Sequence, residues 1–425
     1  MRVDHFSSRT GGGAGAGARR LHEALLEAGV DSRFWYWRKG RPTPRASARV
    51  VLWGDGPWAL RAASRLGGRV RRRAIKSELR AQRQGAPPGL ELFTPPTVGW
   101  ATPFSRGRFS GQVAHLHWVA GLIDHPTFFG SLPQGHPVVW TLRDMNPFTG
   151  GCHFSNGCER FTEGCGSCPQ LGRPSPDDLS RRYLEVKRAA LRGVNLHVVA
   201  PSRWMLEYAR RSPVFEDAQS FRRIPTGVET DVFQPQDKES ARNALGVPPE
   251  RLVVAFGSER LDNVRKGLTL GLKALGQLGT ERPVQVLCFG EELPKDTLPD
   301  GLPVHSLGYI SDPDVLARAY SAADCFVLPS LEDNLPKTGL EALACGTPVV
   351  AFNAGGIPDF VIPGETGLLA ETGDTESLAR QIDWMVEHDE ERVAMGQRAR
   401  EFVLERFRAE GQAMAYQDLY ESLCR

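Results

Sequence analysis

Two carboxylates in the last third of the chain carry the strongest chemical signal. Asp333 follows an apolar run that ends near Ser330, and Glu341 lies eight positions further along. Pro336 suits the first turn of a helix and Gly346 suits its end, so Glu341 is expected inside that helix. Carboxylates placed in this way can meet different hydroxyl groups of one bound ligand. The alternative is a capped helix whose acidic side chains are merely solvated.

Half of the eight cysteines cluster in one segment of seventeen residues, as Cys152, Cys158, Cys165 and Cys168. Thiolates grouped this closely suit tetrahedral zinc in a reducing compartment, with His153 as an alternative ligand. Four sulfur ligands leave no open coordination position, so the prediction is a structural zinc rather than a catalytic one. The alternative is a set of reduced or disulfide-forming thiols.

The N-terminal segment has the pattern of a strand, a glycine loop and a helix. Arg2–Phe6 is strand-like, Gly11–Gly17 is rich in glycine, and apolar residues recur at helical spacing after Ala18. Glycine allows close approach of a ligand, and a helix N-terminus favours anions, so Gly12 and Gly13 are candidate binding residues. The spacing matches neither a dinucleotide fingerprint nor a phosphate-binding loop with its lysine, so a flexible loop is the alternative.

Strand-like runs alternate with helical segments along both halves of the chain. They lie at Ala114–Trp118, Pro137–Leu142, Asn195–Ala200, Leu252–Phe256, Val284–Phe289, Cys325–Leu328 and Pro348–Phe352. This alternation is typical of parallel α/β domains. A chain of 425 residues is longer than a domain with a single hydrophobic core usually is. We therefore expect two doubly wound, Rossmann-like domains, 1–235 and 236–400, with a ligand cleft between them. A final helix, 401–425, is expected to pack back on the first domain.

The composition is that of an ordinary globular protein, with 41% hydrophobic residues, 24% charged residues and a net charge of +2. We find no run of about 18 apolar residues and no signal peptide, which predicts a cytoplasmic location. Residues 58–84 hold nine arginines and lysines among apolar residues. They predict either peripheral contact with the anionic inner face of a membrane or a solvated helix, broken at Gly67-Gly68.

The run Glu-Asp-Asn-Leu-Pro at 332–336, with Glu341 behind it, resembles the acidic motif of the GT4-like retaining glycosyltransferases (glycosyl transferases group 1). Its form, together with the four-cysteine loop, resembles one subgroup of that family. Further blocks match the family in the same order: Gly12–His22, His115–Trp118, Thr141–Leu171, Pro201–Trp204 and Ile224–Val228. The resemblance implies the GT-B fold and transfer of a sugar, a hexose, from a nucleotide-diphosphate donor to an acceptor.

The resemblance also implies a donor site in the second half. Glu341 would hold the ribose hydroxyls and Asp333 the sugar; the family usually has glutamate at the first position, so either Asp333 or Glu332 faces the sugar. Lys266 and Arg260 would lie against the diphosphate, where fixed cations stabilise the charge of the departing group, and Arg265 competes with Arg260 for this role. The other donor-side candidates are Gly12, Gly13, Asn334, Leu335, Lys337 and Thr338. No divalent metal is expected to be required for catalysis.

The acceptor side is expected in the first half, at His117, Arg143 and Asp144. The family has histidine where this chain has Arg143, and that histidine lies near the reacting sugar in relatives. Arg143 could instead meet an acidic acceptor.

The sequence therefore predicts a retaining glycosyltransferase of polysaccharide or glycolipid assembly that acts by front-side attack. Neither the donor sugar and its base nor the acceptor can be read from the residues. One alternative is a nucleotide-sugar epimerase of the same architecture, which would need no acceptor. Another is a zinc-containing nucleic-acid-binding protein with steeply salt-dependent affinity, although we expect no nucleic-acid partner.

Overall fold

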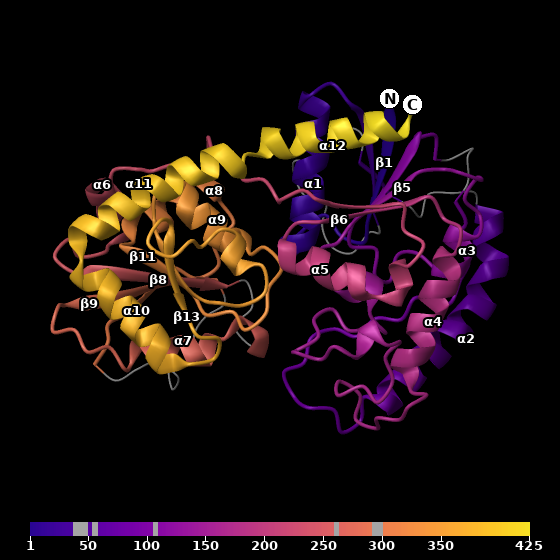
Figure 1. The fold of residues 1–425 in the computed structure, drawn as a ribbon, viewed down its shortest axis with the longest axis horizontal. Helices are drawn as coiled ribbons and strands as arrows, with labels where there is room; N and C mark the ends of the chain where they lie inside the picture. The colour runs from indigo at the N-terminus through magenta and orange to yellow at the C-terminus, as the bar shows by residue number, and fades with distance from the viewer. Residues whose placement is uncertain (37–49, 53–57, 105–108, 259–262, 291–300) are drawn as a thin grey trace. The chain divides into compact units, whose positions relative to one another are not determined.

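The computed structural model describes residues 1–36, 50–52, 58–104, 109–258, 263–290 and 301–425. The chain forms two compact units (Figure 1). The first unit comprises Met1–Pro225 and Gln412–Arg425, and the second comprises Thr226–Gly411. Each unit is built on its own parallel sheet.

The sheet of the first unit has the strand order β3-β2-β1-β4-β5-β6-β7. The strands are β1 Arg2–Ser7, β2 Asp31–Tyr36, β3 Val50–Leu52, β4 Val113–Leu116, β5 Val138–Thr141, β6 Leu196–Ala200 and β7 Ser220–Arg223. The helices of this part are α1 Gly12–Glu27, α2 Trp58–Gln82, α3 His125–Phe129, α4 Leu179–Leu191 and α5 Arg203–Arg211. The order reverses between β1 and β4, and ligands of open α/β sheets bind at such a switch point.

The sheet of the second unit has the strand order β10-β9-β8-β11-β12-β13, and its strands are parallel. The strands are β8 Leu252–Ser258, β9 Val284–Gly290, β10 Val304–Ser306, β11 Cys325–Leu328, β12 Val349–Phe352 and β13 Gly367–Ala370. The helices are α6 Lys238–Leu245, α7 Leu268–Leu275, α8 Pro313–Ala322, α9 Lys337–Ala344, α10 Thr375–Glu387 and α11 Asp389–Arg406. This is the six-stranded Rossmann order, with its switch point between β8 and β11.

The predicted α/β fold and all eight predicted strands, Arg2–Phe6 included, are confirmed, with ends shifted by at most two residues. The runs that became strands are buried on both faces, which is why they read as continuous apolar segments. Five strands were not predicted from the sequence: β2, β3, β7, β10 and β13. The edge strand β7 is Ser-Phe-Arg-Arg, and its two arginines are exposed, so it lacks the apolar signal.

The division between the units falls at Pro225–Thr226, so the expected boundary at 235–236 lies inside the second unit. The reason is the packing of Val228 and Phe233 into the core of that unit. Val228 also exchanges backbone hydrogen bonds with the segment between the last two helices: its N–H donates to the Phe407 carbonyl at 2.8 Å, and its carbonyl accepts from the Ala409 N–H at 3.0 Å.

The segment 401–425 is not one helix. The helix α11 ends at Arg406, and α12 spans Ala409–Leu423. Phe407 is buried and leaves helical geometry at φ −132°, which interrupts the helix where it meets Val228. Within the first unit, Tyr416 and Tyr420 of α12 pack in a cluster with Val113 of β4 and Val139 of β5.

The helix α2 runs without interruption through Gly67-Gly68, which corrects the expected break. Gly68 serves close packing: a Cβ there would lie 3.3 Å from the carbonyl oxygen of Gly99. Glycine inside a helix costs about 1 kcal/mol relative to alanine, and a helix of 25 residues tolerates that cost. Among the described residues, no helix is both long and apolar enough to cross a bilayer.

Candidate functional site

The acidic motif of the second unit forms a charged cluster at the end of β11. The carboxylate of Asp333 lies 2.6 Å from the Lys266 ammonium and 3.4 Å from the Arg265 guanidinium. Its other oxygen accepts the backbone N–H of Asn334 at 3.0 Å. Asp333 is only 7% exposed, so these contacts hold a carboxylate that is largely withdrawn from water.

Two opposing effects set the pKa of Asp333. Burial would raise the pKa, but the charges of Lys266 and Arg265 outweigh it, and the pKa lies below its usual value. The side chain is therefore ionised at neutral pH. The two cations form the other half of this cluster: the Lys266 side chain is 28% exposed, and the Arg265 side chain is buried at 8%.

Topology explains why these residues meet. Arg265 and Lys266 form the turn after β8, Val264–Lys266, and Asp333 follows β11. The strands β8 and β11 are paired neighbours, and the strand order reverses between them. The cluster therefore lies at the carboxyl edge of the sheet beside the switch point, which is the usual ligand position of this fold.

The backbone fixes the loop that carries Asp333. The N–H of Gly356 donates to the Asp333 carbonyl at 2.8 Å. Gly355 has φ +56°, and a Cβ there would lie 2.1 Å from the same carbonyl oxygen. The neighbouring Glu332 carbonyl accepts a 2.6 Å hydrogen bond from Arg265. The loop is thus clamped from both sides.

The second carboxylate, Glu341, lies inside α9 as expected and is 5% exposed. Lys337, one turn earlier, lies 3.3 Å from it, and the Tyr320 hydroxyl donates to it at 3.4 Å. The helix begins at Lys337 behind Pro336, which provides no side-chain cap. Its first N–H groups and the partly exposed Lys337 and Thr338 are therefore placed to meet an anion.

The remaining donor-side candidates divide into three groups. Asn334 and Leu335 are buried in the loop beside Asp333. Gly12 and Gly13 lie in the first unit, exposed at the start of α1, with open space where a side chain would project. Arg260 lies outside the described residues, so its predicted role against the diphosphate stays a prediction.

On the acceptor side, the structure brings His117 and Arg143 together at the carboxyl ends of β4 and β5. An Arg143 Nη atom lies 3.4 Å from His117 Nδ1. His117 Nε2 lies 3.0 Å from His5 Nδ1, and His5 stacks on His117 at 5.3 Å between ring centroids. The register pairs His5 with His115, so the histidines of β1 and β4 share one buried site.

This histidine cluster was not predicted from the sequence. His5, His115 and His117 are at most 1% exposed. Both ring nitrogens of His115 contact hydroxyl groups, that of Tyr420 at 2.6 Å and that of Thr141 at 2.7 Å. The sequence signal that could have revealed the cluster is a histidine within each of two apolar strands, His5 in β1 and His115 in β4.

Donor atoms of His5, His115 and His117 lie within 4.8 Å of one another, so by distance the three could hold a metal ion. Two observations argue against a resident ion. His115 already shares both nitrogens with hydroxyl groups, and the Arg143 guanidinium lies beside His117, where it would repel a second cation. The cluster fits a hydrogen-bonded network of neutral rings better than a metal site.

The third acceptor-side candidate, Asp144, pairs with a histidine. Its carboxylate lies 2.6 Å from His153 Nδ1 and accepts the Trp118 indole N–H at 2.6 Å. The other ring nitrogen of His153 contacts the Thr94 hydroxyl at 2.8 Å. Both nitrogens of His153 are therefore occupied by partners other than the cysteines, and the structure does not support His153 as an alternative zinc ligand.

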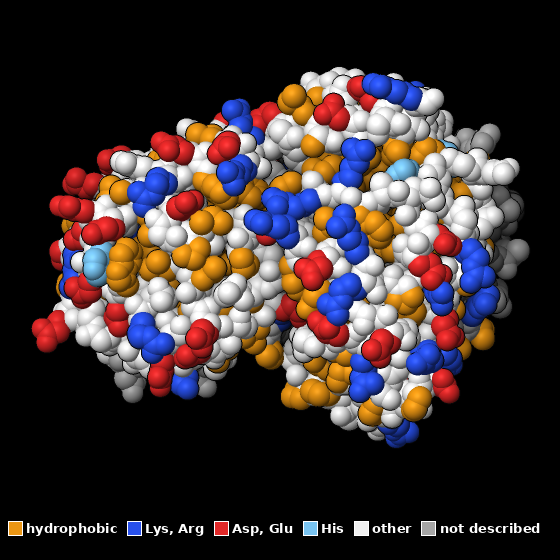
Figure 2. Space-filling model, in the orientation of Figure 1, with side chains coloured by type: hydrophobic (Ala, Val, Ile, Leu, Met, Phe, Trp, Pro, Cys, Tyr) orange, Lys and Arg blue, Asp and Glu red, His pale blue; other side chains and the backbone are white. Residues whose placement is uncertain are grey.

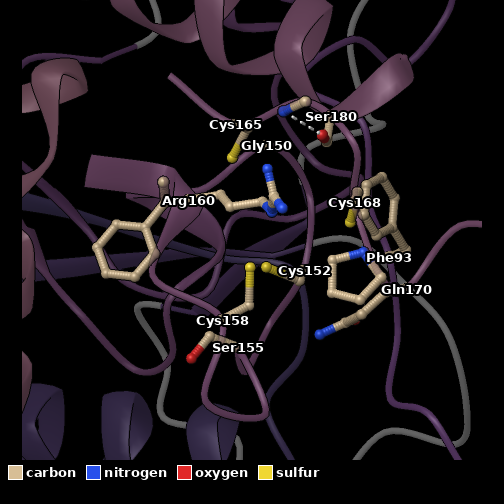
Figure 3. A pocket seen from close by; sticks show the side chains of 13 residues that line it. Phe93, Gly150, Cys152, Ser155, Cys158, Arg160, Cys165, Cys168, Gln170 and Ser180 are labelled. Carbon is tan, nitrogen blue, oxygen red and sulfur yellow. Dashed lines mark hydrogen bonds between the residues drawn. The ribbon is translucent and has the colours of Figure 1, made fainter. Parts of the chain in front are cut away.

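The four clustered cysteines line one small cavity of about 20 Å³, which is room for a single water-sized species (Figure 3). All four are free thiols, and no three of their sulfur atoms lie within 4.8 Å of one another in the described chain. Burial raises the pKa of Cys165 to about 12 and that of Cys168 to about 11. Without a cation these side chains are protonated.

The residues around this cavity fit a thiolate-bound metal by their chemistry. The backbone N–H of Gly150 hydrogen-bonds to Cys165, and that of Gln170 to Cys168. Arg160 also lines the cavity, and Figure 3 shows its side chain directed toward the sulfurs. Such N–H donors and a cation would stabilise the negative charge of four thiolates around one divalent ion.

Comparison with known proteins places these sites in context. Residues 237–402 match the family "Glycosyl transferases group 1". A D-inositol 3-phosphate glycosyltransferase from Segniliparus rotundus is 33% identical over 191 residues, which cover 42% of this chain and 42% of that protein. The chain spans about half the length of the curated relatives it matches.

Two solved structures share the whole fold. Sucrose-phosphate synthase from Thermosynechococcus elongatus superposes with a TM-score of 0.69 at 22% identity, over 100% of this chain and 99% of that one. An Anabaena protein solved in complex with UDP-glucose superposes with a TM-score of 0.61 at 16% identity, over 99% of this chain and 100% of that one. Residues 237–402 of the second unit therefore resemble a glycosyl transferases group 1 domain, and the whole chain shares the two-sheet GT-B fold with these two solved structures.

Proposed function

We propose that the protein is a retaining glycosyltransferase that moves a hexose from a nucleotide-diphosphate sugar to an acceptor. The observation that carries this proposal is the cluster of Asp333, Lys266 and Arg265 at the switch point of the second sheet, with Glu341 in the helix that follows. The cluster combines cations for a diphosphate with carboxylates for hydroxyl groups. The UDP-glucose complex of the Anabaena relative supports a donor of this class.

Each group has a task in this reaction. Glu341 binds the ribose hydroxyls, and the Asp333 loop, including Glu332 and Asn334, faces the donor sugar. Lys266 and Arg265, with Lys337 and Thr338 at the start of α9, bind the diphosphate. The bond between the anomeric carbon and the phosphate oxygen breaks, and a new bond to the acceptor oxygen forms on the same face. The acceptor proton passes to the leaving phosphate, whose charge the cations stabilise.

The acceptor is proposed to bind in the first unit, near His117, Arg143 and Asp144. Proteins similar to this chain include a D-inositol 3-phosphate glycosyltransferase and a solved glycosyltransferase involved in lipopolysaccharide biosynthesis. An acceptor of polysaccharide or glycolipid assembly is consistent with these names. The exposed cations of α2 would then hold the protein at an anionic membrane face.

A structural zinc is proposed for Cys152, Cys158, Cys165 and Cys168. When bound, the ion would cross-link the loop 152–168 and stabilise its fold, without an open position for catalysis. Because Cys152 directly precedes His153, the same loop supports the contact between His153 and Asp144.

Two other functions have less support. An epimerase would leave the acceptor-side residues without a task. A nucleic-acid-binding protein would need a continuous basic surface, but acidic and basic side chains are interspersed on the face drawn in Figure 2. It would also leave the carboxylates beside Lys266 and Arg265 unexplained.

A thermal-shift screen of nucleotide sugars tests the proposal. A donor at 100 times its Kd stabilises the protein by about 2.7 kcal/mol, which is a shift of several degrees in Tm. Incubation of the stabilising donor with candidate acceptors, followed by product analysis, then separates transfer from epimerisation. The proposal fails if no nucleotide sugar raises Tm, or if the donor sugar is converted without an acceptor.

A further inference from the structure

Two arginines follow the strands β1 and β5 at the carboxyl edge of the first sheet. The register aligns Phe6 of β1, Leu116 of β4 and Trp140 of β5 in one row. Arg9 and Arg143 each lie three residues beyond this row, at the carboxyl ends of β1 and β5. The alignment continues past the strands, since the Ser8 N–H donates to the Trp118 carbonyl at 2.7 Å. The two arginines therefore flank the end of β4.

Each guanidinium group is held in place by its neighbours. Arg143 packs against α1, where a Cβ on Gly17 would lie 3.1 Å from one of its Nη atoms, and it contacts His117 Nδ1 at 3.4 Å. Arg9 lies over the Trp118 ring, 5.2 Å from the ring centroid, and is exposed. This cation–π interaction favours the observed position of the Arg9 guanidinium group. The Arg9 charge is thus exposed at this edge, whereas the Arg143 charge is partly buried.

The surroundings leave this edge positively charged. Burial lowers the pKa of His5, His115 and His117 well below the usual value, so these rings are neutral. The nearby Asp144 is one acidic group against the two guanidinium groups, and its carboxylate accepts the Trp118 indole N–H and the backbone N–H of Asn146. The helix α1 also starts at this edge, and its first turn contains no acidic residue.

We propose that this edge, with Arg143 as its central contact, binds an anionic group carried by the acceptor sugar, a carboxylate or a phosphate. The inference rests on the proposed function and adds the chemical class of the acceptor. A guanidinium group can form two parallel hydrogen bonds to either anion, which gives direction as well as charge. A neutral sugar could not accept such a pair of charge-assisted hydrogen bonds.

Saturation-transfer NMR on the full-length protein, at constant ionic strength, tests the inference with matched probes. The probes are glucose, glucuronate and glucose 6-phosphate, so the two anionic arms separate a carboxylate from a phosphate. We expect at least one anion to bind about tenfold more tightly than glucose, as expected for one charge-assisted hydrogen bond. Arg143→Gln should remove this preference, whereas Arg143→Lys should retain only part of it.

Two further variants keep the test decisive. Arg9→Gln probes the same edge through an exposed side chain, so its effect does not depend on the buried network. Arg182→Gln is the matched control, because Arg182 is an exposed arginine of the same unit that pairs with Glu78. Equal binding of glucose and both anions, or a preference that survives Arg143→Gln and Arg9→Gln, overturns the inference. Stabilisation by a nucleotide sugar, measured on the same samples, shows whether the proposed function stands independently.

Discussion

At the scale of single residues, the contact between Lys266 and Asp333 joins two needs of the proposed reaction. The lysine keeps a buried carboxylate ionised, and it belongs to the turn that is proposed to bind the diphosphate. Removing Lys266 would therefore leave the buried negative charge of Asp333 less well balanced and the negative charge of the departing diphosphate less well stabilised. Lys266 is therefore expected to affect the binding of both the sugar and the diphosphate of the donor.

Lys266→Ala is expected to lower turnover by a factor of roughly 100, in the range found when one charge-stabilising group is lost. Glu341→Gln is expected to weaken donor binding by roughly tenfold or more, with a smaller effect on kcat, since a ribose contact acts equally in the ground and transition states. Steady-state kinetics with the donor found by thermal shift would measure both. Lys273→Ala, at an exposed lysine of the same unit, is the control, and unchanged kinetics in both test variants would contradict the assignment.

The histidine cluster predicts how stability depends on pH. The pKa values of His5, His115 and His117 are lowered by burial, so the folded protein keeps these rings neutral while the unfolded chain protonates them below about pH 6.5. The unfolded state then binds more protons, and stability falls as pH falls through this range. The loss is about 1.4 kcal/mol per pH unit for each histidine once the pH is well below 6.5.

Melting curves at pH 7.5 and pH 5.0 measure this effect. His5→Gln should reduce the difference in Tm between the two pH values, because one of the titrating groups is gone. His305→Gln, at a partly exposed position of the other unit, is the control. A difference in Tm that is the same in both variants would show that the cluster is not its source.

At the scale of elements, α12 closes the first unit from the C-terminal end of the chain. The Tyr420 hydroxyl is hydrogen-bonded to His115 Nδ1, and the Tyr416 hydroxyl is hydrogen-bonded to the Thr141 hydroxyl, each at 2.6 Å. These hydroxyl groups satisfy polar atoms that lie among apolar strands. The helix therefore matches both the apolar surface and the polar groups of the sheet.

Tyr420→Phe is expected to destabilise the first unit by about 1–3 kcal/mol, because it leaves a buried nitrogen of His115 without its partner. The expected drop in Tm is roughly 2–8 °C by differential scanning calorimetry. Tyr309→Phe removes a hydroxyl group from a side chain that is 69% exposed and is the matched control. Equal Tm values for the two variants would argue against the docking role.

The cysteine loop carries its own prediction. Purified protein is expected to contain about one equivalent of zinc by elemental analysis, since a Cys₄ set forms a closed structural site. Cys165→Ser should lose the metal and lower Tm, whereas the exposed Cys424→Ser should do neither. A zinc content below about half an equivalent in the wild type would refute the metal assignment.

At the scale of the whole molecule, the unbroken helix α2 presents exposed cations along a single element. Val70 of the same helix is 66% exposed, so the surface combines charge with apolar contact. Such a helix suits the interface of an anionic membrane. A protein that acts on a lipid-linked acceptor would benefit from that position.

We expect the protein to co-sediment with vesicles that contain anionic lipid, and to be released by high salt. Replacing Arg69, Arg73 and Lys76 with glutamine should weaken binding by roughly fivefold for each charge. The control removes three exposed cations of the second unit, Lys273, Arg380 and Arg406. Equal recovery with anionic and neutral vesicles would leave α2 as a solvated helix.

The limits of the sequence follow from the nature of each signal. Buried strands and the helix α9 were predictable because apolar periodicity and the punctuation by proline and glycine are local properties. The placement of Asp333 after a strand and of Glu341 within a helix was predictable for the same reason, since both residues lie in one strand–loop–helix segment. The break expected at Gly67-Gly68 was wrong because the packing of Gly68 against Gly99 is a tertiary contact.

The α/β class, the carboxylate pair and the grouping of four cysteines can be read along the chain, because these features depend on neighbouring residues. Three contacts appear only in the folded chain: Lys266 pairs with Asp333, His5 contacts His117, and His153 contacts Asp144 instead of the cysteines. These pairs join residues on different strands or loops. Their contacts depend on strand order and register, which no local pattern encodes.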